Sequence, residues 1–217
     1  MRESAANMAY RRSARMQARL DDNRQRIRDA ARRIIAGGGF RHAQMAAVAE
    51  AAGLSTGSLY RYFPSKAELF IDVLGAAADH EIRILESIGS AGGSVQDRLQ
   101  AAVRSYAGRA LEGPHLAHAF MVEPVEPELD SARQYHRKRV AAAYRAILDE
   151  GVAGGVFPEQ DTGLAAACLV GAMTEALSGP TAEAPATADE RRRLVESICR
   201  FCLRAVSANR TPADDAA

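Results

Sequence analysis

The chain has 217 residues, 47% of them apolar and 25% charged, and it contains three cysteines. This length predicts one large domain or a small domain beside a larger one. The odd number of cysteines argues against a disulfide framework and for a reducing cytoplasm. The sequence shows neither a secretory signal nor an apolar run of the ~18 residues that a membrane span needs. The net charge of +1 conceals an asymmetry, because residues 1–70 carry 13 Arg and Lys against 6 Asp and Glu, whereas residues 71–217 carry 15 against 21. The basic charge of residues 1–70, beside the acidic charge of residues 71–217, suggests that the N-terminal part binds a polyanion.

The first predicted helix runs from Asn23 to Ala36 and ends at three consecutive glycines. Its apolar residues recur at steps of three and four: Ile27, Ala30, Ala31 and Ile34. Residues 1–22 precede it as a basic arm that we expect to be flexible. The arm contains Arg11, Arg12, Arg15 and Arg19. These arginines can contact phosphates or enter a minor groove, and a solvated disordered tail is an equally good interpretation.

Two short helices follow, at about 44–51 and 55–63, and Gly53 separates them. Ser55 is a good N-cap, and Pro64 prevents the second helix from continuing. A capping box, Ser65-Lys66-Ala67-Glu68, then opens a long helix to about Ile88. Three helices, of which the last two are short and joined by a tight glycine turn, predict a helix-turn-helix domain over residues 23–68.

Residues 69–208 show helical periodicity only, and residues 209–217 are expected to form a flexible tail. Helices are predicted at about 95–111, after Gly113-Pro114, at about 131–153, at 162–179 and from the capping box that starts at Thr187. The segment 162–179 is apolar nearly all round and should be buried on several sides. The last helix has an apolar stripe formed by Leu194, Ile198, Phe201 and Ala205. The predicted fold class is therefore all-α, with a small three-helix domain and a larger helical domain.

The helix at 55–63 has the side chains expected of a helix that reads DNA. Leu59 and Phe63 hold it on the core, which leaves small residues outside, and small residues let a helix enter a major groove about 12 Å wide. Its N-terminus also offers unpaired N–H groups to phosphates. We expect base contacts from Gln44, Thr56 and Ser58, phosphate contacts from Tyr60, Tyr62 and Lys66, and a supporting role for Ser55 and Gly57. Ordinary packing around half-buried tyrosines is the plainer alternative.

The stretch "FRHAQMAAVAEAAGLSTGSLYRYFPSKAELF" closely resembles the N-terminal domain of the TetR family of transcriptional regulators. The resemblance is carried by Gly39-Phe40, Val48-Ala49, Ala52-Gly53-Leu54-Ser55, Gly57, Leu59-Tyr60, Tyr62-Phe63, Ser65-Lys66 and Leu69. It covers about residues 24–70. One departure is Ala43-Gln44, where many members of the family open the second helix with a small hydroxyl residue that caps the helix and contacts phosphate.

The resemblance implies about nine helices, a ligand-binding and dimerisation domain at 69–208, and a homodimer formed by the last two long helices. It further implies a cytoplasmic, sequence-specific DNA-binding transcriptional regulator that needs no cofactor and is not an enzyme. A repressor released from a palindromic operator by a small-molecule inducer is the commoner mode of the family, and a ligand-responsive activator is the alternative.

The central helices should enclose the ligand. Its candidate contacts are Tyr106, His115, His118, Phe120, Met121, Tyr135, Met173 and Leu177, although each of these also suits an ordinary core. His115 and His118 share a helix face, but no third metal ligand is evident, so no metal site is predicted. Cys199 and Cys202 lie inside an amphipathic helix, where small buried side chains at a dimer interface are a better interpretation than a redox sensor.

Two other functions fit parts of the sequence. Gly53-Leu54-Ser55-Thr56-Gly57 matches the Gly-x-Ser-x-Gly of a hydrolase, but that motif needs a strand before the serine, where a short helix is predicted. A non-specific nucleoid protein would also bind DNA, but the acidic charge of residues 71–217 and the few lysines argue against it.

Overall fold

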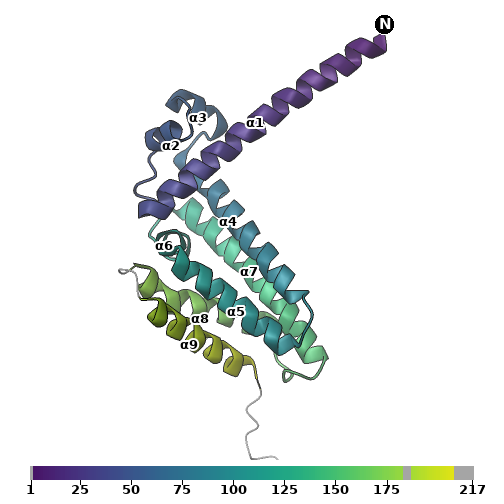
Figure 1. Cartoon of the computed structure of the whole chain (residues 1–217), viewed down its shortest axis with the longest axis vertical. Coiled ribbons are helices and arrows are strands. Elements are labelled where there is room, and N and C mark those ends of the chain that lie inside the picture. Colours follow the sequence, from purple (N-terminus) through teal and green to yellow (C-terminus); the bar gives the residue numbers. More distant parts are fainter. Residues whose placement is uncertain (1, 183–186, 208–217) are drawn as a thin grey trace, which may run out of the picture. The chain divides into compact units, whose positions relative to one another are not determined.

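The computed structural model describes residues 2–182 and 187–207, with side chains from Met16 to Thr181 in the first range. Over these residues the secondary structure consists of nine α-helices and no strand, as predicted (Figure 1). The helices are α1 (Arg2–Gly38), α2 (Met45–Ala51), α3 (Thr56–Tyr62), α4 (Lys66–Gly89), α5 (Val95–Glu112), α6 (Pro114–Met121), α7 (Pro127–Ala153), α8 (Thr162–Ala182) and α9 (Ala188–Val206). The chain divides into two compact units, Met1–Val73 and Leu74–Ala217, and α4 crosses the boundary.

The first unit is a three-helix arrangement in which α1 packs on α2 and α2 packs on α3. Its core combines the inner faces of α1 and α2 with Leu59 and Phe63 of the α3 region, which are both almost completely buried. Phe40 and Phe70 add an aromatic contact, with ring centroids 4.7 Å apart. On α1 the buried isoleucines are Ile27 and Ile35, so the predicted Ile34 lies at the edge of this face rather than in it.

Helix α1 begins much earlier than predicted. The arm expected over residues 1–22 is helical from Arg2 and continues without a break into the helix predicted from Asn23. The reason is local, because no Gly or Pro interrupts residues 2–36 and Ala, Arg, Gln and Met are strong helix formers. Side-chain hydrogen bonds at a spacing of four add support, from Gln17 to Asp21 and from Gln25 to Asp29.

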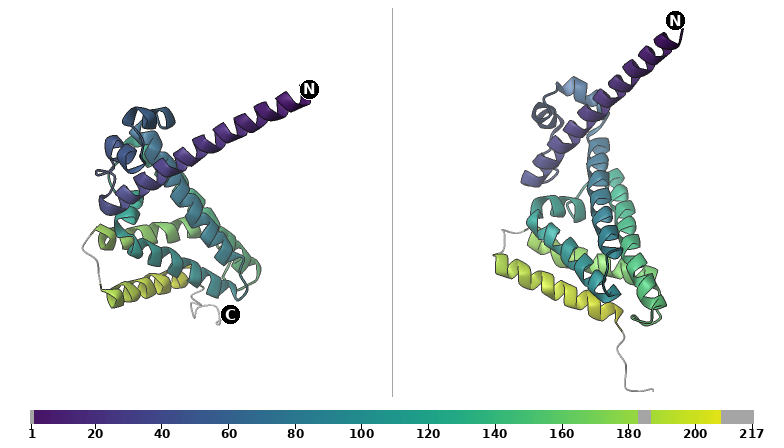
Figure 2. Two further views of the ribbon diagram at one scale, coloured as in Figure 1. Left: turned by 45° about the horizontal axis from the view of Figure 1, so that its top comes forward. Right: turned by 45° about the vertical axis from the view of Figure 1, so that its right-hand side comes forward.

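The second unit packs α5, α7, α8 and α9 around one apolar core, with α6 against α5 and α8 (Figure 2). Tyr144 is the largest fully buried side chain, and its hydroxyl donates to the Ala102 carbonyl at 3.2 Å. Helix α7 begins at Pro127 instead of the predicted Ser131, because proline is well suited to the first turn of a helix, where its missing N–H has no partner to lose.

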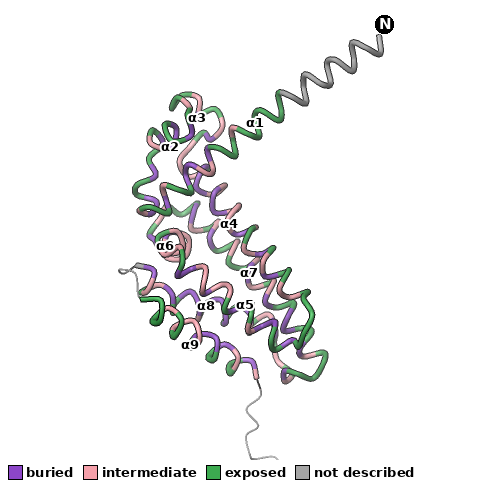
Figure 3. Tube along the Cα trace, in the orientation of Figure 1, coloured by how far each residue is buried: buried purple, intermediate pink, exposed green. Residues whose placement is uncertain are grey.

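Helix α8 is buried along one side only, which corrects the expectation of burial on several sides. Met173 and Leu177 are completely buried, whereas Leu164 and Cys168 are exposed on another face of the helix (Figure 3). The span Thr162–Thr181 is also long and apolar enough to cross a membrane, contrary to the expectation from the sequence, although 39% of it is buried inside the protein. Its buried side belongs to the core of the second unit, and its other side is exposed in the single chain.

The apolar stripe predicted for α9 is likewise only partly buried. Ile198 is buried, but Phe201 and Ala205 are exposed, and the core side is completed by Cys199, Cys202 and Val206. The two cysteines therefore lie in the core of the single chain, and not at an interface between chains as the sequence suggested. The tail expected at 209–217 lies outside the described residues.

Candidate nucleic-acid interface and ligand-binding region

The turn between α2 and α3 is fixed by its glycine and by α1. Gly53 has φ +68°, a left-handed conformation that residues with a Cβ rarely adopt. Its N–H donates to the Glu50 carbonyl and that of Leu54 donates to Ala49, both at 2.9 Å, which closes α2. The Arg26 guanidinium donates to the Ala52 carbonyl at 2.6 Å, so α1 holds the turn directly.

Ser55 caps α3 as predicted. Its hydroxyl accepts the backbone N–H of Ser58 at 3.2 Å and lies 2.9 Å from the Ser58 hydroxyl. The residues before it belong to the α2 helix and its closing turn, so Ser55 does not stand at the end of a strand. The geometry of a hydrolase nucleophile elbow is therefore missing at this serine.

The exposed side of α3 begins with small residues, and Tyr60 and Arg61 follow them. Thr56 and Gly57 are exposed, and Tyr60 retains 46% of its surface, while Leu59 between them is fully buried. A methyl group added at Gly57 would meet no atom within 4 Å. Helix α3 therefore presents a low, open surface that a large partner can approach closely.

The other predicted DNA-contacting residues differ in how far they are buried and in which contacts their side chains already make. The Gln44 side chain is exposed at the start of α2 and donates to the Arg41 carbonyl at 2.8 Å. The Tyr62 hydroxyl accepts from Asn23 at 2.9 Å and keeps its own proton available for donation. Lys66 is half-buried, with its ammonium 5.2 Å from the centre of the Phe70 ring.

Sequence reasoning missed the contacts that α1 makes with the α3 region and with α4. The Arg24 guanidinium lies over the Phe63 ring at 4.7 Å, and Arg28 forms an ion pair with Asp72 at 2.7 Å. Asn23, Arg24 and Arg26 therefore hold the α3 region on α1, and Arg28 holds the start of α4. The amphipathic pattern identified α1 as a core helix. The sequence does not show, however, which distant residue a long polar side chain will contact.

In the second unit, four of the eight predicted ligand contacts belong to one apolar cluster: Tyr106, Met121, Met173 and Leu177. His118 and Phe120 are half-buried on α6, and the Nδ1 atom of His118 is buried without a hydrogen-bond partner. His115 and Tyr135 are instead exposed. Among the described residues, no group of three metal-ligating side chains occurs around the two histidines or elsewhere.

Polar groups gather beside this cluster. Glu81 of α4 forms an ion pair with Arg109 of α5, with Oε2 and Nε 3.1 Å apart. Burial, reinforced by the nearby Glu81 carboxylate, raises the pKa of Tyr106 to about 12, so its hydroxyl stays protonated and can donate a hydrogen bond. Burial also raises the pKa of both Cys199 and Cys202, the latter to about 11, which makes them poor nucleophiles and argues against a redox sensor.

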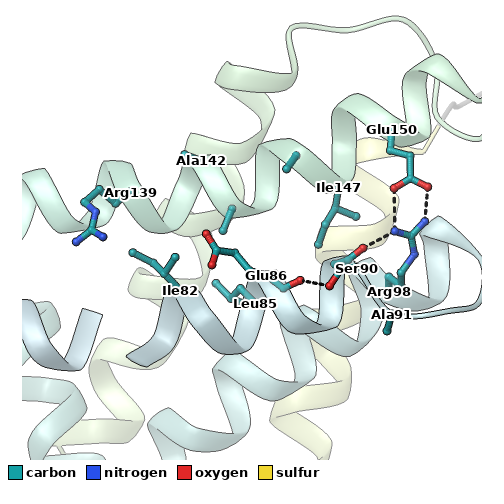
Figure 4. Close-up of a pocket in the computed structure, with 13 residues that line it drawn as sticks. Ile82, Leu85, Glu86, Ser90, Ala91, Arg98, Arg139, Ala142, Ile147 and Glu150 are labelled. Carbon is teal, nitrogen blue, oxygen red and sulfur yellow. Dashed lines mark hydrogen bonds and ion pairs between the residues drawn. The ribbon is translucent and has the colours of Figure 1, made fainter. Parts of the chain in front are cut away.

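A groove of about 850 Å³ lies between α4 and α7 (Figure 4). Its sides combine apolar residues such as Ile82, Leu85 and Ile147 with alanines of α7, and none of the eight predicted ligand contacts lines it. One end is closed by Arg98, which is buried and bonds Glu150 through two nitrogens, at 2.8 Å for Nη1. This hydrogen bonding lowers the pKa of the Glu150 carboxyl. The groove is large enough for a small organic molecule.

A glycine turn between two short helices, with the second helix capped and exposed, defines the chain as a helix-turn-helix protein. The family model described as "Bacterial regulatory proteins, tetR family" matches residues 27–73, and the model "Tetracyclin repressor-like, C-terminal domain" matches residues 92–178. Together the two matches cover more than half of the chain. The chain belongs to the TetR family of bacterial regulatory proteins.

Curated relatives resemble part of the chain. The chain is 41% identical to the HTH-type transcriptional repressor KstR of Mycolicibacterium smegmatis over 78 residues. These residues make up 36% of this chain and 38% of that protein. The chain is 48% identical over 54 residues to KstR of Mycobacterium tuberculosis, which is 25% of this chain and 24% of that protein. The matches therefore span about two fifths or less of the length of these relatives.

Solved structures resemble nearly the whole fold. FadR from Bacillus subtilis in complex with stearoyl-CoA has a TM-score of 0.71 and 21% identity, over 84% of this chain and 98% of that one. The fatty acid degradation regulator FadR from Bacillus halodurans has a TM-score of 0.69 and 22% identity, over 82% and 97%. At these identities the likeness concerns the fold.

Proposed function

We propose that this protein is a cytoplasmic transcriptional repressor that binds a palindromic operator through α3 and is released from it by a small-molecule ligand. The observation that carries the proposal is the exposed surface of α3, in which small residues stand over a buried Leu59 and Phe63. Such a helix can enter a major groove without steric conflict. The identity with the KstR repressors supports the direction of regulation.

Residue roles within the interface follow from chemistry and exposure. Thr56, Ser58 and Gln44 are proposed to contact bases, since hydroxyl and amide groups form hydrogen bonds with base edges. Tyr60, Tyr62 and Lys66 are proposed to contact phosphates and so to fix the register of α3 on the duplex.

A homodimer is part of the proposal. Leu164 of α8 and Phe201 of α9 retain 63% and 59% of their surface in the single chain. The other exposed residues of α8 are mostly small, which allows another helix to approach closely. Two copies joined through α8 and α9 would present two α3 helices to the two halves of a symmetric operator.

The second unit is proposed to bind the ligand, either within the cluster around Tyr106 or in the groove between α4 and α7. Stearoyl-CoA is the first probe to use, because it is bound in the FadR structure from Bacillus subtilis. Helix α4 belongs to both units. A ligand that prefers one position of α4 would shift the population away from the operator-binding state, by at most its difference in affinity for the two states, typically ~1–3 kcal/mol.

The experiment compares single substitutions on a preferred duplex, obtained by selection, and on single-base variants of it. Thr56→Ala should change which bases are preferred, whereas Tyr60→Ala and Lys66→Ala should weaken binding to every duplex by a similar factor. If all three substitutions weaken every duplex equally, the division into base-reading and phosphate-contacting residues is wrong. Stearoyl-CoA is then titrated into the protein–duplex complex. Release of the duplex would identify stearoyl-CoA as a ligand that can act as an inducer.

A further inference from the structure

The N-terminal half of α1 extends beyond the three-helix core. Among the side chains described in this helix, Ile27 is the first that is buried, and residues 16–22 are all exposed. The helix nevertheless continues back to Arg2 and projects past α2 and α3 (Figures 1 and 2). At 1.5 Å per residue, residues 2–22 add about 30 Å of helix to the unit. The family match begins only at residue 27, so this extension has no role assigned by it.

One face of α1 contacts the turn that leads into α3 and the last residue of α3. Arg26 donates to the carbonyl of Ala52, the C-cap of α2, and Asn23 donates to the hydroxyl of Tyr62, the last residue of α3. This face of α1 therefore points toward the side of the unit on which α3 lies. Any duplex seated on the outer surface of α3 is on the same side.

The same face continues along the extension as a row of arginines. A helix turns about 100° per residue, so positions 11, 12, 15 and 19 all lie within about 60° of the direction of Arg26. We call these four positions the arginine face: Arg11, Arg12, Arg15 and Arg19. No acidic residue lies between positions 11 and 19, and the Arg19 side chain is exposed. Asp22 lies on the same side of the helix, between Arg19 and Arg26.

Charge and continuity identify the partner as duplex DNA. Guanidinium groups hold phosphate oxygens with paired hydrogen bonds, and they stay charged at any physiological pH. A straight helix of about 30 Å can lie beside several phosphates, since each strand of a duplex carries one phosphate for about every 3.4 Å of its axis. Because the face adjoins the α3 interface, DNA bound by α3 would extend past it.

We infer that the arginine face binds the phosphate backbone of the DNA that flanks each operator half-site. The inference rests on the proposed DNA-binding function of α3. Binding by the arginine face would add affinity that does not depend on sequence and would make binding more sensitive to salt. It would not change which bases are preferred.

The experiment compares two matched variants of the full chain. R15S/R19Q removes two charges from the arginine face. S13R/R15S/Q17R/R19Q has the composition and net charge of the wild type, but it places those two arginines on the opposite side of the helix. Binding to the preferred duplex and to a random duplex is measured by fluorescence anisotropy between about 50 and 300 mM salt. Wild-type binding over this range supplies the reference slope.

Both variants should bind both duplexes about ten-fold or more weakly than the wild type. Their salt slopes should be shallower by roughly 0.9 for each phosphate that an arginine no longer neutralises. A double variant that binds like the wild type would overturn the inference. So would a relocated variant that recovers wild-type affinity, because net charge on a flexible tail would then be sufficient. A wild-type chain that prefers no duplex would instead contradict the proposed function itself.

Discussion

Gly53 and Gly57 lie four residues apart and place different demands on the chain. Gly53 has φ +68°, and a Cβ there would come within 2.9 Å of Arg26 Nη2. Gly57 has ordinary helical geometry and open space around it. The first glycine is thus required by the fold, while the folded chain gives no reason for the second, since glycine within a helix is less stable than alanine.

Gly53→Ala should lower the free energy of unfolding by about 1–2 kcal/mol, because alanine is strained in the left-handed conformation. It should also weaken operator binding, since it displaces the Arg26 side chain that holds the turn. Gly155→Ala is a matched control, because Gly155 also has φ +68° but has no atom within 4 Å of the added methyl. Thermal unfolding of both variants tests this, and a smaller loss for Gly53→Ala than for Gly155→Ala would count against the role of Arg26.

Gly57→Ala should leave the fold intact, or stabilise it by up to about 1 kcal/mol, while weakening operator binding. The physical reason is that only bound DNA would meet the new methyl group. Gly108→Ala in α5, where the space is equally open, should match its stability and bind DNA like the wild type. Unfolding and duplex titrations are compared for the two variants, and unchanged affinity for Gly57→Ala would place the DNA elsewhere.

At the scale of whole elements, His136 of α7 lies beside α4. Its ring lies near Gly75 of α4, and burial together with the neighbouring Arg139 lowers the pKa of His136 below 6.5, which Asp79 offsets only in part. The folded state therefore binds fewer protons than the unfolded state just below pH 6.5. Stability should fall as the pH decreases from 6.5 toward the lowered pKa.

His136→Gln removes this contribution. The difference in unfolding free energy between pH 7 and pH 5.5 should be smaller in the variant than in the wild type, as measured by denaturant titration at both values. An equal difference in the two proteins would show that His136 titrates alike in the folded and unfolded states.

The sequence predicted the elements better than their ends and contacts. The buried pair Leu59 and Phe63 followed from its spacing, and the caps at Ser55 and Thr187 are confirmed. The predicted start of α1 was wrong, because charged residues can indicate disorder although their helix propensity is high. The polar cluster of Glu81, Arg109 and Tyr106 could not be predicted, since it joins two helices whose relative rotation no local pattern specifies.

At the scale of the whole molecule, dimerisation determines whether α3 can act on a symmetric site. Leu164→Glu should convert the proposed dimer into a monomer, because it places a charge on an apolar surface that a partner would otherwise cover. Val156→Glu, at an exposed residue outside α8 and α9, is the matched control and should remain dimeric. Light scattering after size-exclusion chromatography gives the mass. A wild-type protein that is already monomeric would contradict the proposed assembly.

Selection of duplexes from a random library by the wild-type chain is the decisive test of operator recognition by α3. We expect enrichment of a sequence with two inverted half-sites, whose centres lie about one helical turn (~34 Å) or somewhat more apart. That enrichment should disappear when Thr56 and Gly57 are changed together. Enrichment of a sequence without inverted symmetry, or no enrichment at all, would contradict recognition of a symmetric operator by a pair of α3 helices.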